Sequence, residues 1–384
     1  MDIYQVTLPG KVCFGVGSIG RIKDEAAKLG ARRALIVTDP GVYKAGLVGL
    51  VKEPLSQANI SVDVFSEAEP EPTLPRMNAI AGDLRGKRYD LLLGLGGGSS
   101  LDTAKALSVL LAHGGKAEDY LGNDKVPGPG IPLFTLPTTA GTGSEVTNLA
   151  IFGDPAKQLK LAIISSHLLA RVAVVDPVLT YNCPPRVTAA SGIDALTHAI
   201  ECYTGKKANS FSDVLALKAM GLISGSLRTA VKNGADREAR SHMAEGALFA
   251  GIAFGNSAVA AVHALAYPLG SRFHVPHGVA NGLLLPYVMQ ASLSADPVRY
   301  ATVAQALGVE TQGLSPEEAA QQGAAAVKSL VADSGIPLHL RDLGVPRDSL
   351  EGMAKDTMEI DRLLSVNAKH LTQEDVRQIW FEAW

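Results

Sequence analysis

Short apolar runs alternate with amphipathic stretches along the first half of the chain. The apolar runs predict five strands, at residues 34–39, 62–65, 89–95, 131–137 and 172–177. Residues 21–29 and 101–111 carry apolar side chains at helical spacing and predict helices. Strands that are apolar throughout and separated by helices are typical of a parallel sheet covered on both faces. We therefore expect the first half to be an α/β domain with a Rossmann-like parallel sheet.

After about Pro185 the pattern changes to segments rich in Ala and Leu with helical period, and strand-like runs nearly vanish. Helices are predicted at residues 210–231, 237–254, 315–333 and 373–384. The boundary between the two sequence patterns is expected at residues 181–185, which include two prolines. The predicted domains are therefore residues 1–182, an α/β domain, and residues 183–384, an all-helical domain.

One stretch, residues 246–271, contains no Asp, Glu, Lys or Arg and is long enough to span a bilayer. Its Gly251 and Gly255 even form a pair of small residues at the spacing used by membrane helices. However, it also contains Asn256, His263 and Pro268, and its many Ala and Gly residues are poor drivers of insertion. We expect a helix buried inside a soluble domain and no membrane contact.

Composition narrows the class of protein. Of 384 residues, 47% are hydrophobic and 19% charged, which excludes a disordered chain. The 35 basic and 38 acidic residues give a net charge of −3 without long blocks of one sign, so a nucleic-acid-binding surface is not expected. Three cysteines without paired spacing favour a reducing compartment, and the N-terminus shows no signal-peptide pattern. We expect a cytoplasmic protein.

A glycine-rich loop, residues 96–100, directly follows one predicted strand and precedes a predicted helix. Glycines let the backbone approach a ligand closely, and a helix N-terminus attracts anions. A tight structural turn is the alternative, but phosphate binding is favoured. A second loop, residues 138–145, is rich in hydroxyl groups and follows the next strand in the same way. Two such loops at successive strand ends fit a phosphate-bearing cofactor.

A match to the pattern G-x-G-x-x-G occurs at residues 15–20, with Asp39 about twenty residues later. The preceding apolar run is very short, so a plain turn is favoured over pyrophosphate binding. Asp39 ends the first predicted strand, where its carboxylate would accept hydrogen bonds from an adenosine ribose and repel a 2′-phosphate. NAD is therefore preferred over NADP, and a helix N-cap is the alternative role for Asp39.

Acidic and imidazole side chains occur in otherwise apolar segments of the second half. Asp194 and His198 are four residues apart and project from one face of a predicted helix. His263 lies in the uncharged stretch, and His274 and His277 follow it. Hydrogen-bonded core histidines are the alternative, but a shared divalent cation would satisfy all these polar groups together. One carboxylate with several imidazoles suits Fe²⁺ or Zn²⁺.

Taken together, these features resemble the iron-containing (group III) alcohol dehydrogenase family over nearly the full length of the chain. The resemblance implies the dehydroquinate synthase-like/iron-containing alcohol dehydrogenase fold. The segments that carry it are Phe14-Gly15-Val16-Gly17, Asp39, GGGSSLDTAKA (96–106), TTAGTGSEVTN (138–148), Lys160-Leu161-Ala162-Ile163, Asp176-Pro177, GIDALTHAIE (192–201), VHALAYPLG (262–270), His277-Gly278 and Asn281-Gly282.

The resemblance implies a set of site residues. The metal ligands by this comparison are Asp194, His198, His263 and His277. The residues placed around NAD are Asp39, Gly97, Gly98, Ser99, Thr138, Thr139, Thr147, Leu149 and Lys160. The resemblance also implies a homodimer or a larger homo-oligomer. His274 is not a family ligand and is expected to line the cleft or support a ligand.

Two departures from the family pattern affect the catalytic residues. The position four after His263 is often histidine in the family, with a role in proton relay, whereas here it is Tyr267. We assign Tyr267 and His277 to catalysis. Phe254 is a candidate pocket wall, and a core aromatic is the favoured alternative for it. The family's Asn-Pro-Arg pattern near the C-terminus is replaced by residues 367–369, Asn-Ala-Lys, which weakens inference about the substrate pocket.

The expected function is a metal-dependent alcohol dehydrogenase or aldehyde reductase. It transfers a hydride between NAD and a small aliphatic alcohol, diol or hydroxy acid, with Fe²⁺ as the expected metal and Zn²⁺ suited to the same ligands. Alternatives within the superfamily are enzymes like dehydroquinate synthase, glycerol dehydrogenase or maleylacetate reductase. Few Lys and Arg on the metal-bearing helices argue against the first, and the intact ligand set argues against the last.

Overall fold

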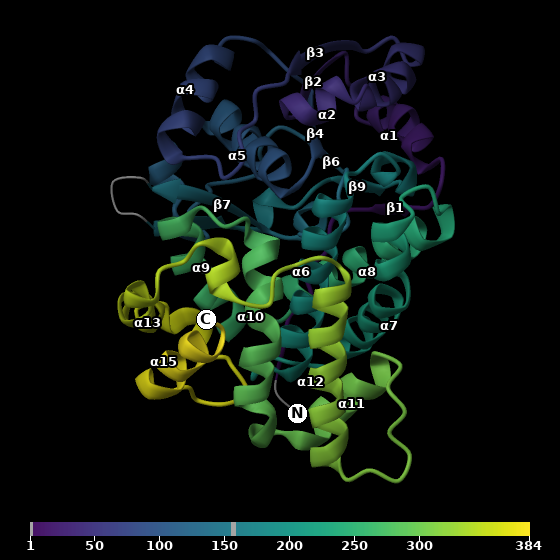
Figure 1. The fold of residues 1–384 in the computed structure, drawn as a ribbon. Helices are drawn as coiled ribbons and strands as arrows, with labels where there is room; N and C mark the ends of the chain where they lie inside the picture. Colours follow the sequence, from purple (N-terminus) through teal and green to yellow (C-terminus); the bar gives the residue numbers. More distant parts are fainter. Residues whose placement is uncertain (1–2, 155–158) are drawn as a thin grey trace. The chain divides into compact units, whose positions relative to one another are not determined.

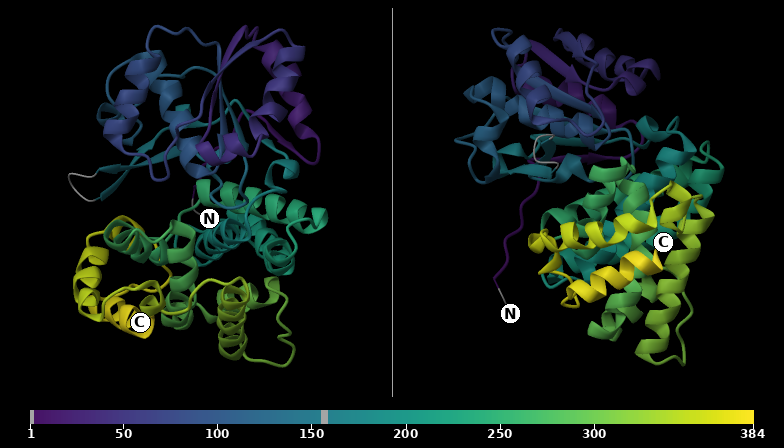
Figure 2. Two further views of the ribbon diagram at one scale, coloured as in Figure 1. Left: turned by 45° about the horizontal axis from the view of Figure 1, so that its top comes forward. Right: turned by 60° about the vertical axis from the view of Figure 1, so that its left-hand side comes forward.

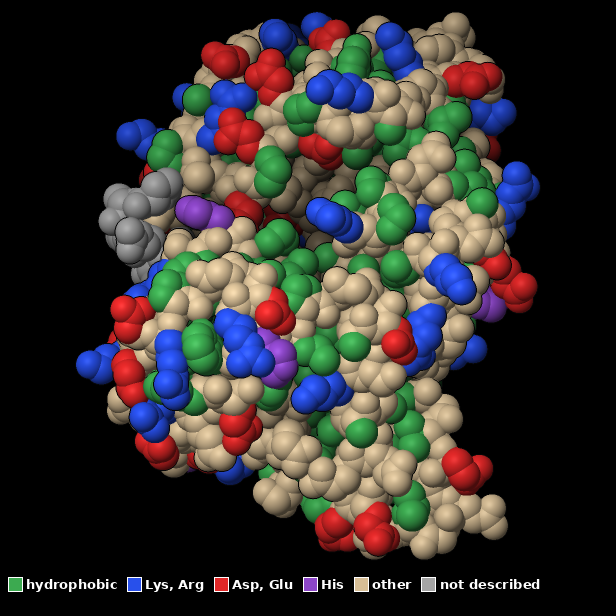
Figure 3. Space-filling view, in the orientation of Figure 1, with side chains coloured by type: hydrophobic (Ala, Val, Ile, Leu, Met, Phe, Trp, Pro, Cys, Tyr) green, Lys and Arg blue, Asp and Glu red, His purple; other side chains and the backbone are tan. Residues whose placement is uncertain are grey.

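The computed structural model describes residues 3–154 and 159–384, which fall into two compact units (Figure 1). One unit is Thr7–Cys183, and the other is Pro184–Trp384 together with the N-terminal residues up to Val6. The sequence analysis placed the joint between residues 182 and 183, next to this division. Charged side chains of both signs are interspersed on the face drawn in Figure 3.

The N-terminal unit is built on a six-stranded, fully parallel sheet with the order β1-β9-β6-β4-β2-β3 (Figure 1). The strands are β1 (Val12–Phe14), β2 (Arg33–Val37), β3 (Ser61–Phe65), β4 (Leu91–Gly96), β6 (Leu133–Pro137) and β9 (Val172–Val175). All five predicted strands are present, and the parallel-sheet prediction is confirmed. The very short run before the G-x-G pattern is also a strand, β1, which lies at the sheet edge and pairs with β9.

Helices cover both faces of this sheet because successive strand side chains point to opposite faces. Leu35, Val37 and Leu92 pack against α4 (Leu74–Leu84) and α5 (Gly98–His113). Their neighbours along the same strands are buried against α1 (Ile22–Lys28) and α3 (Leu47–Gln57). Burial on both faces explains why these strands are apolar throughout.

A second, small sheet was not predicted. It has the order β5-β8-β7, and its main part is the antiparallel pair β7 (Leu149–Asp154) and β8 (Leu159–Ile164). The expectation of parallel strands alone was therefore incomplete for this half. The described residues of β7 alternate between buried and partly exposed positions, which gives a weaker sequence signal than a fully buried strand.

The C-terminal unit is helical, as expected, and none of its described residues lies in a strand (Figure 2). Its helices are α6 (Pro185–Thr204), α7 (Ser210–Lys232), α8 (Arg237–Gly255), α9 (Ala261–Phe273), α10 (His277–Ser292), α11 (Pro297–Ala306), α12 (Pro316–Asp333), α13 (Leu350–Met358), α14 (Asp361–Leu364) and α15 (Gln373–Glu382). The sequence prediction of one buried helix at 246–271 was wrong: this stretch contains the end of α8, a break at 256–260, and most of α9.

By length and composition, α7 is the one helix among the described residues that is long and apolar enough to cross a membrane. It packs extensively against α6 and α8 and also contacts α11. These contacts favour a core helix of the helical unit over a membrane span.

Candidate functional site

Helix α6 carries three polar side chains on one buried face. Asp194, His198 and Glu201 follow one another at i, i+4 and i+7, so they lie along one side of the helix. All three are buried, with exposed fractions of 2%, 4% and 3%. Buried acidic side chains are rare unless they are paired or hydrogen-bonded, so this face needs polar partners from other helices.

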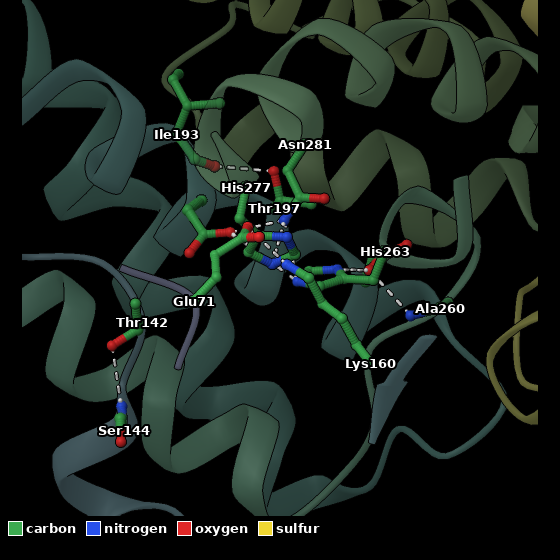
Figure 4. A network of polar contacts seen from close by, with 12 residues as sticks. Glu71, Thr142, Ser144, Lys160, Ile193, Thr197, Ala260, His263, His277 and Asn281 are labelled. Carbon is green, nitrogen blue, oxygen red and sulfur yellow. Dashed lines mark hydrogen bonds and ion pairs between the residues drawn. The ribbon is translucent and has the colours of Figure 1, made fainter. Parts of the chain in front are cut away.

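The partners come from α9 and α10. The Nε2 atom of His263 lies 4.0 Å from Asp194 Oδ1, and the Nε2 atom of His277 lies 3.8 Å from the same oxygen. The ligand atoms of these three residues all lie within 4.8 Å of one another. Figure 4 shows His263 and His277 together with Asn281. Burial raises the pKa of Asp194, but the surrounding imidazoles and the Asn281 amide outweigh this effect, so its pKa lies below the ordinary value.

Glu201 fixes the orientation of His263. Its carboxylate accepts a hydrogen bond of 2.6 Å from His263 Nδ1, and it also accepts the backbone N–H groups of Ala260 and Val262. Those N–H groups belong to the first turn of α9 and its cap, where no side chain of the helix itself serves as a cap. Because Nδ1 donates its proton to Glu201, the lone pair on Nε2 points at the other ligand atoms.

Asp194 Oδ1 and His263 Nε2 are acceptors, and His277 Nε2 is an acceptor in the tautomer that a metal ligand requires. The one amide that faces all three atoms cannot donate to each of them. Asn281 Nδ2 lies 2.7 Å from Asp194 Oδ1 and 3.2 Å from each of the two Nε2 atoms. An amide has only two protons for these three acceptors. Its own Oδ1 is buried and lacks a hydrogen-bond partner among the described residues.

This donor set fits a divalent cation. Fe²⁺ or Zn²⁺ bound to imidazole and carboxylate at about 2.0–2.2 Å separates two ligand atoms by about 3–4 Å, and the distances of 3.8 and 4.0 Å lie at the upper end of that range. The three residue types fit the expected metal, and a small approach of their side chains would bring them to ligand distance.

His198 lies beside this group without joining its ligand atoms. Its ring stacks on His263, with 4.8 Å between centroids, and on Phe254, with 4.9 Å and nearly parallel planes. The structure thus places Phe254 against an imidazole of the site, where it restricts the orientation of that ring. His198 as a fourth ligand remains a prediction from the resemblance.

Two further sequence candidates lie on α9. Tyr267 is one turn after His263, and its ring is 6.4 Å from that of His277. Burial raises the pKa of the Tyr267 phenol, and the guanidinium of Arg362 opposes this effect by its charge and by a side-chain hydrogen bond. His274 is exposed and ends α9 in the left-handed region, with φ of 54°, and no hydrogen bond or ring contact described here joins it to the ligand group.

In the N-terminal unit, the predicted cofactor loops all follow the carboxyl-terminal ends of neighbouring strands. Strands β2, β4 and β6 are neighbours, and Asp39, Gly97 and Thr138 follow their carboxyl ends. In the sheet, β3 lies on one side of β2 and β4 lies on the other side. The order of the strands therefore reverses at β2, and the carboxyl ends of β2 and β4 form a topological switch point. Ligands of open α/β sheets bind at such points.

The glycine loop itself forms a cradle for an anion. Helix α5 starts at Gly98 with Gly97 as N-cap, and no side chain caps its first N–H groups. A Cβ at Gly98 would lie 2.9 Å from the Thr142 side chain, and a Cβ at Gly97 would reach Thr139 at 3.6 Å. The free N–H groups and the missing side chains fit a phosphate of the dinucleotide.

Asp39 has hydrogen-bond partners at both carboxylate oxygens. Oδ1 accepts the backbone N–H groups of Gly41 and Val42, so Asp39 is the N-cap of α2 (Pro40–Lys44). Oδ2 accepts the hydroxyl of Ser100 at 3.1 Å, which ties the end of β2 to the glycine loop. The alternative role as a helix cap is therefore present, and hydrogen bonding to ribose remains a prediction.

Two buried charged side chains of α5 hold the hydroxyl-rich loop and the start of β7 in place by hydrogen bonds. Lys105 Nζ donates to Thr147 Oγ1 at 3.2 Å and to the Leu149 carbonyl at 2.8 Å. Asp102 accepts the Ser144 hydroxyl at 2.6 Å and the Ile151 N–H at 3.0 Å. Two residues assigned to the cofactor from the sequence, Thr147 and Leu149, are thus hydrogen-bonded to Lys105.

Lys160, on β8, forms an ion pair of 2.8 Å with Glu71 (Figure 4). Glu71 adopts φ of 51°, in the left-handed region, and its N–H donates to Ser99 Oγ at 3.3 Å. Lys160 is thereby linked through Glu71 to the glycine loop, next to Ser99.

Sequence reasoning missed several residues of these sites. Glu201 lies inside the GIDALTHAIE segment, and its i+7 spacing from Asp194 was a signal that could have identified it. Lys105 and Asp102 lie inside the GGGSSLDTAKA segment, where charged residues in an apolar helix were a similar signal. Nothing local in the sequence connects Asn281 or Arg362 with the residues that they face.

The chain matches two family models. The model described as "Iron-containing alcohol dehydrogenase" covers residues 9–177, and "Fe-containing alcohol dehydrogenase family, C-terminal" covers residues 188–384. Long-chain-alcohol dehydrogenase 1 of Geobacillus thermodenitrificans is 43% identical over 387 residues, spanning 100% of this chain and 98% of the relative.

Solved structures agree over the whole chain. A structure of 1,3-propanediol oxidoreductase has a TM-score of 0.96 and 36% identity and covers 100% of both chains. Sulfoacetaldehyde reductase from Bifidobacterium kashiwanohense, solved in complex with NAD⁺, has a TM-score of 0.90 and 28% identity and covers 100% of this chain and 99% of its own.

Proposed function

This chain belongs to the iron-containing alcohol dehydrogenase family, and we propose that its two units divide one reaction between them. Residues 1–182 bind NAD, and residues 183–384 hold the metal and the substrate. The family and NAD-dependent alcohol oxidoreduction, both expected from the sequence, are confirmed by the comparisons. The proposal adds residue roles and a substrate range of small aliphatic alcohols, diols and hydroxy acids.

The single observation that carries the proposal is the group of three acceptor atoms from Asp194, His263 and His277. We assign these residues, with His198 beside them, as ligands of Fe²⁺, and Zn²⁺ would suit the same donors. When bound, such a cation acts as a Lewis acid toward an alcohol or carbonyl oxygen. Glu201 holds His263 in the tautomer that this role requires, and Phe254 holds the ring plane of His198.

For the cofactor, we assign the loops at the switch point of the sheet. Gly97, Gly98 and Ser99 face the phosphates, and Thr138, Thr139, Thr147, Leu149 and Lys160 complete the site. NAD supplies the hydride acceptor, while the protein positions it and excludes competing reactions. Asp39 repels a 2′-phosphate by its charge, which favours NAD over NADP.

We assign the proton path to Tyr267, next to His277. Its raised pKa keeps the phenol protonated at neutral pH, so it passes a proton only by donating one as it accepts another. This differs from an imidazole, whose pKa lies near neutrality. We therefore expect Tyr267→Phe to lower kcat more than it changes KM for the alcohol.

We also propose a cytoplasmic homodimer or larger homo-oligomer. The three cysteines form no disulfide, which fits a reducing compartment. β1 is an edge strand, and Val12, Phe14 and Val16 are exposed by 36%, 39% and 66%. An apolar sheet edge of this kind is stabilised by pairing with a second copy, and sedimentation analysis tests it.

The direct test is a coupled measurement on protein purified without oxygen. Elemental analysis gives the metal content, and NADH absorbance follows oxidation of a panel of short alcohols, diols and hydroxy acids with NAD⁺. We expect about one iron per chain and NADH formation with part of the panel. Absence of NADH formation, and of NADH consumption with the matching aldehydes, would contradict the proposal.

A further inference from the structure

Arg362 has no acidic partner among the described residues, whereas several other arginines of the helical unit do. Arg272 pairs with Asp356, Arg299 with Asp213 and Arg377 with Glu351, at 2.5, 2.7 and 2.7 Å. Among the described residues, no ion pair involves Arg362. A guanidinium carries five N–H donors and a permanent charge, so an unpaired one is ready to bind an anion.

The place of Arg362 links it to the ligand group. It lies on the short helix α14, which packs against α9. There its guanidinium interacts with Tyr267, and the Tyr267 ring is 6.4 Å from that of His277. A single phenol ring therefore separates the Arg362 charge from a residue assigned to hold the metal.

The charges around Tyr267 are distributed unevenly. Asp194 and Glu201 act on it from the ligand side, and both are buried and already engaged by donors within the protein. Arg362 also acts on Tyr267, is itself exposed, and forms no ion pair with a described carboxylate. Tyr267 is therefore next to one positive charge that no described acidic side chain neutralises.

We propose that Arg362 binds the carboxylate of a substrate whose alcohol carbon reacts at the Asp194–His263–His277 group. The inference rests on the proposed function and narrows its substrate class to hydroxy acids and the corresponding aldehyde acids. A guanidinium recognises a carboxylate through two parallel N–H···O bonds, which also fixes the orientation of the bound molecule. Tyr267 lies between the two ends and contacts the intervening carbon chain.

The test compares substrates that differ only in the distal group. Hydroxy acids with the alcohol at the chain end, from glycolate to 6-hydroxyhexanoate, are paired with neutral alcohols of the same carbon number. We expect kcat/KM to favour the acid by about 10- to 100-fold at the length that spans the two groups. The preference should fall as salt is added, because part of it is electrostatic.

Variants of Arg362 separate recognition from folding. Arg362→Met should lower the ratio of kcat/KM for the preferred acid to kcat/KM for the matched alcohol by about 10- to 100-fold. The ratio is the readout, because any effect of the variant through Tyr267 acts on both substrates. Arg362→Lys should restore part of the preference, and Arg362→Glu should reverse it. The control is Arg377→Met, which removes an arginine that is paired with Glu351 and should leave the ratio unchanged.

Calorimetry gives a readout that does not depend on turnover. The hydroxy acid should bind the wild-type protein and bind Arg362→Met at least tenfold more weakly. Equal kcat/KM for acids and alcohols in the wild type, unaltered by Arg362→Met, would overturn this inference while NADH formation upholds the proposed function. Arg362-dependent binding without any NADH formation would uphold the anion site and contradict the dehydrogenase.

Discussion

The two units each bury a cluster of charged side chains, and the two clusters are built in opposite ways. In the N-terminal unit, Asp102 and Lys105 direct every described hydrogen bond to a partner within the protein, namely loop hydroxyls and backbone groups. In the C-terminal unit, Asp194, His263 and His277 direct acceptor atoms at one another. The first cluster is complete as it stands, whereas the second is the one that we propose to hold a cation.

The two clusters are therefore expected to serve different purposes: the first stabilises the fold, and the second binds a ligand. Breaking a complete cluster costs stability, because one partner is left buried without compensation. Breaking the open cluster removes ligands, so the cost appears first in metal binding and activity. The variants below test this division, beginning with the largest expected effect.

The largest effect is expected from His263→Ala. We expect loss of bound metal and a decrease in kcat of at least about a thousandfold, because one of the proposed ligand atoms is removed and Glu201 loses its imidazole partner. Elemental analysis and NADH absorbance measure the two effects. His274→Asn is the control, since His274 is exposed and Asn tolerates its left-handed backbone. Full metal content in His263→Ala would show that the cluster does not bind the cation.

The next effect is expected from Lys105→Met. It leaves Asp102 without its neighbouring cation and two loop acceptors without a donor, so we expect the free energy of unfolding to fall by about 3–5 kcal/mol. Denaturant titration measures it, and Lys44→Met on an exposed position is the control. Adding Asp102→Leu should recover part of the loss, because an apolar pair replaces a broken ionic one. An unchanged unfolding midpoint in Lys105→Met would refute the structural role of the cluster.

A pH dependence is expected from Glu145, which is buried near Lys105. Burial raises the pKa of its carboxyl from 4.5 to about 7. The folded state therefore binds the proton more tightly, and this contribution is fully present below about pH 4.5 and lost as pH rises to about 7. In the wild type, the free energy of unfolding should therefore fall by up to about 3 kcal/mol from this group as pH rises from about 4.5 to about 7. In Glu145→Gln this decrease should be absent, so the free energy of unfolding depends less on pH. Parallel curves for both proteins would contradict the assignment.

A smaller effect is expected from Glu201→Gln. The amide keeps the size of the side chain but replaces one acceptor oxygen by a donor that faces N–H groups. We expect a 10- to 100-fold weaker metal affinity with the helical unit still folded, measured by competition with a chelator. Glu238→Gln, on an exposed position of α8, is the matched control. Retained affinity would mean that His263 is oriented without Glu201.

The smallest effect is expected at Asp39, where two roles overlap. Asp39→Ser keeps a side-chain acceptor for the N-cap of α2 but removes the charge, whereas Asp39→Gly removes both. We expect both variants to raise the NADP-to-NAD ratio of kcat/KM by about tenfold. An unchanged ratio in Asp39→Ser would leave Asp39 with the capping role alone.

The sequence predicted what depends on local pattern. The strands of the large sheet are apolar throughout because both of their faces are buried, so each was visible as a run. The β7–β8 pair is only half buried and was missed. The helix predicted at 237–254 ends within one residue of α8, but the uniform composition of 246–271 gave no signal that a second helix, α9, begins at Ala261.

For the candidate site, the sequence showed which residue types could bind a metal, but it did not show which other side chains contact them. His263 and His277 stand out chemically, whereas Asn281 and Arg362 are ordinary residues until folding places them beside other side chains. Glu201 was an intermediate case, because its helical spacing from Asp194 was available but a glutamate near a helix end has many other uses. Hydrogen bonds between distant segments are the part that pattern alone does not contain.

The pairing of β1 with β9 has a consequence for how the protein is made. Val12 pairs with Ala173, so the first strand of this sheet to be synthesised waits for the last one. Until then, the apolar side chains of β1 have no neighbouring strand, and closing so long a loop is slow. The N-terminal unit thus completes its sheet only after nearly all of it has been synthesised, and nascent chains stalled before residue 172 should be the ones that bind chaperones.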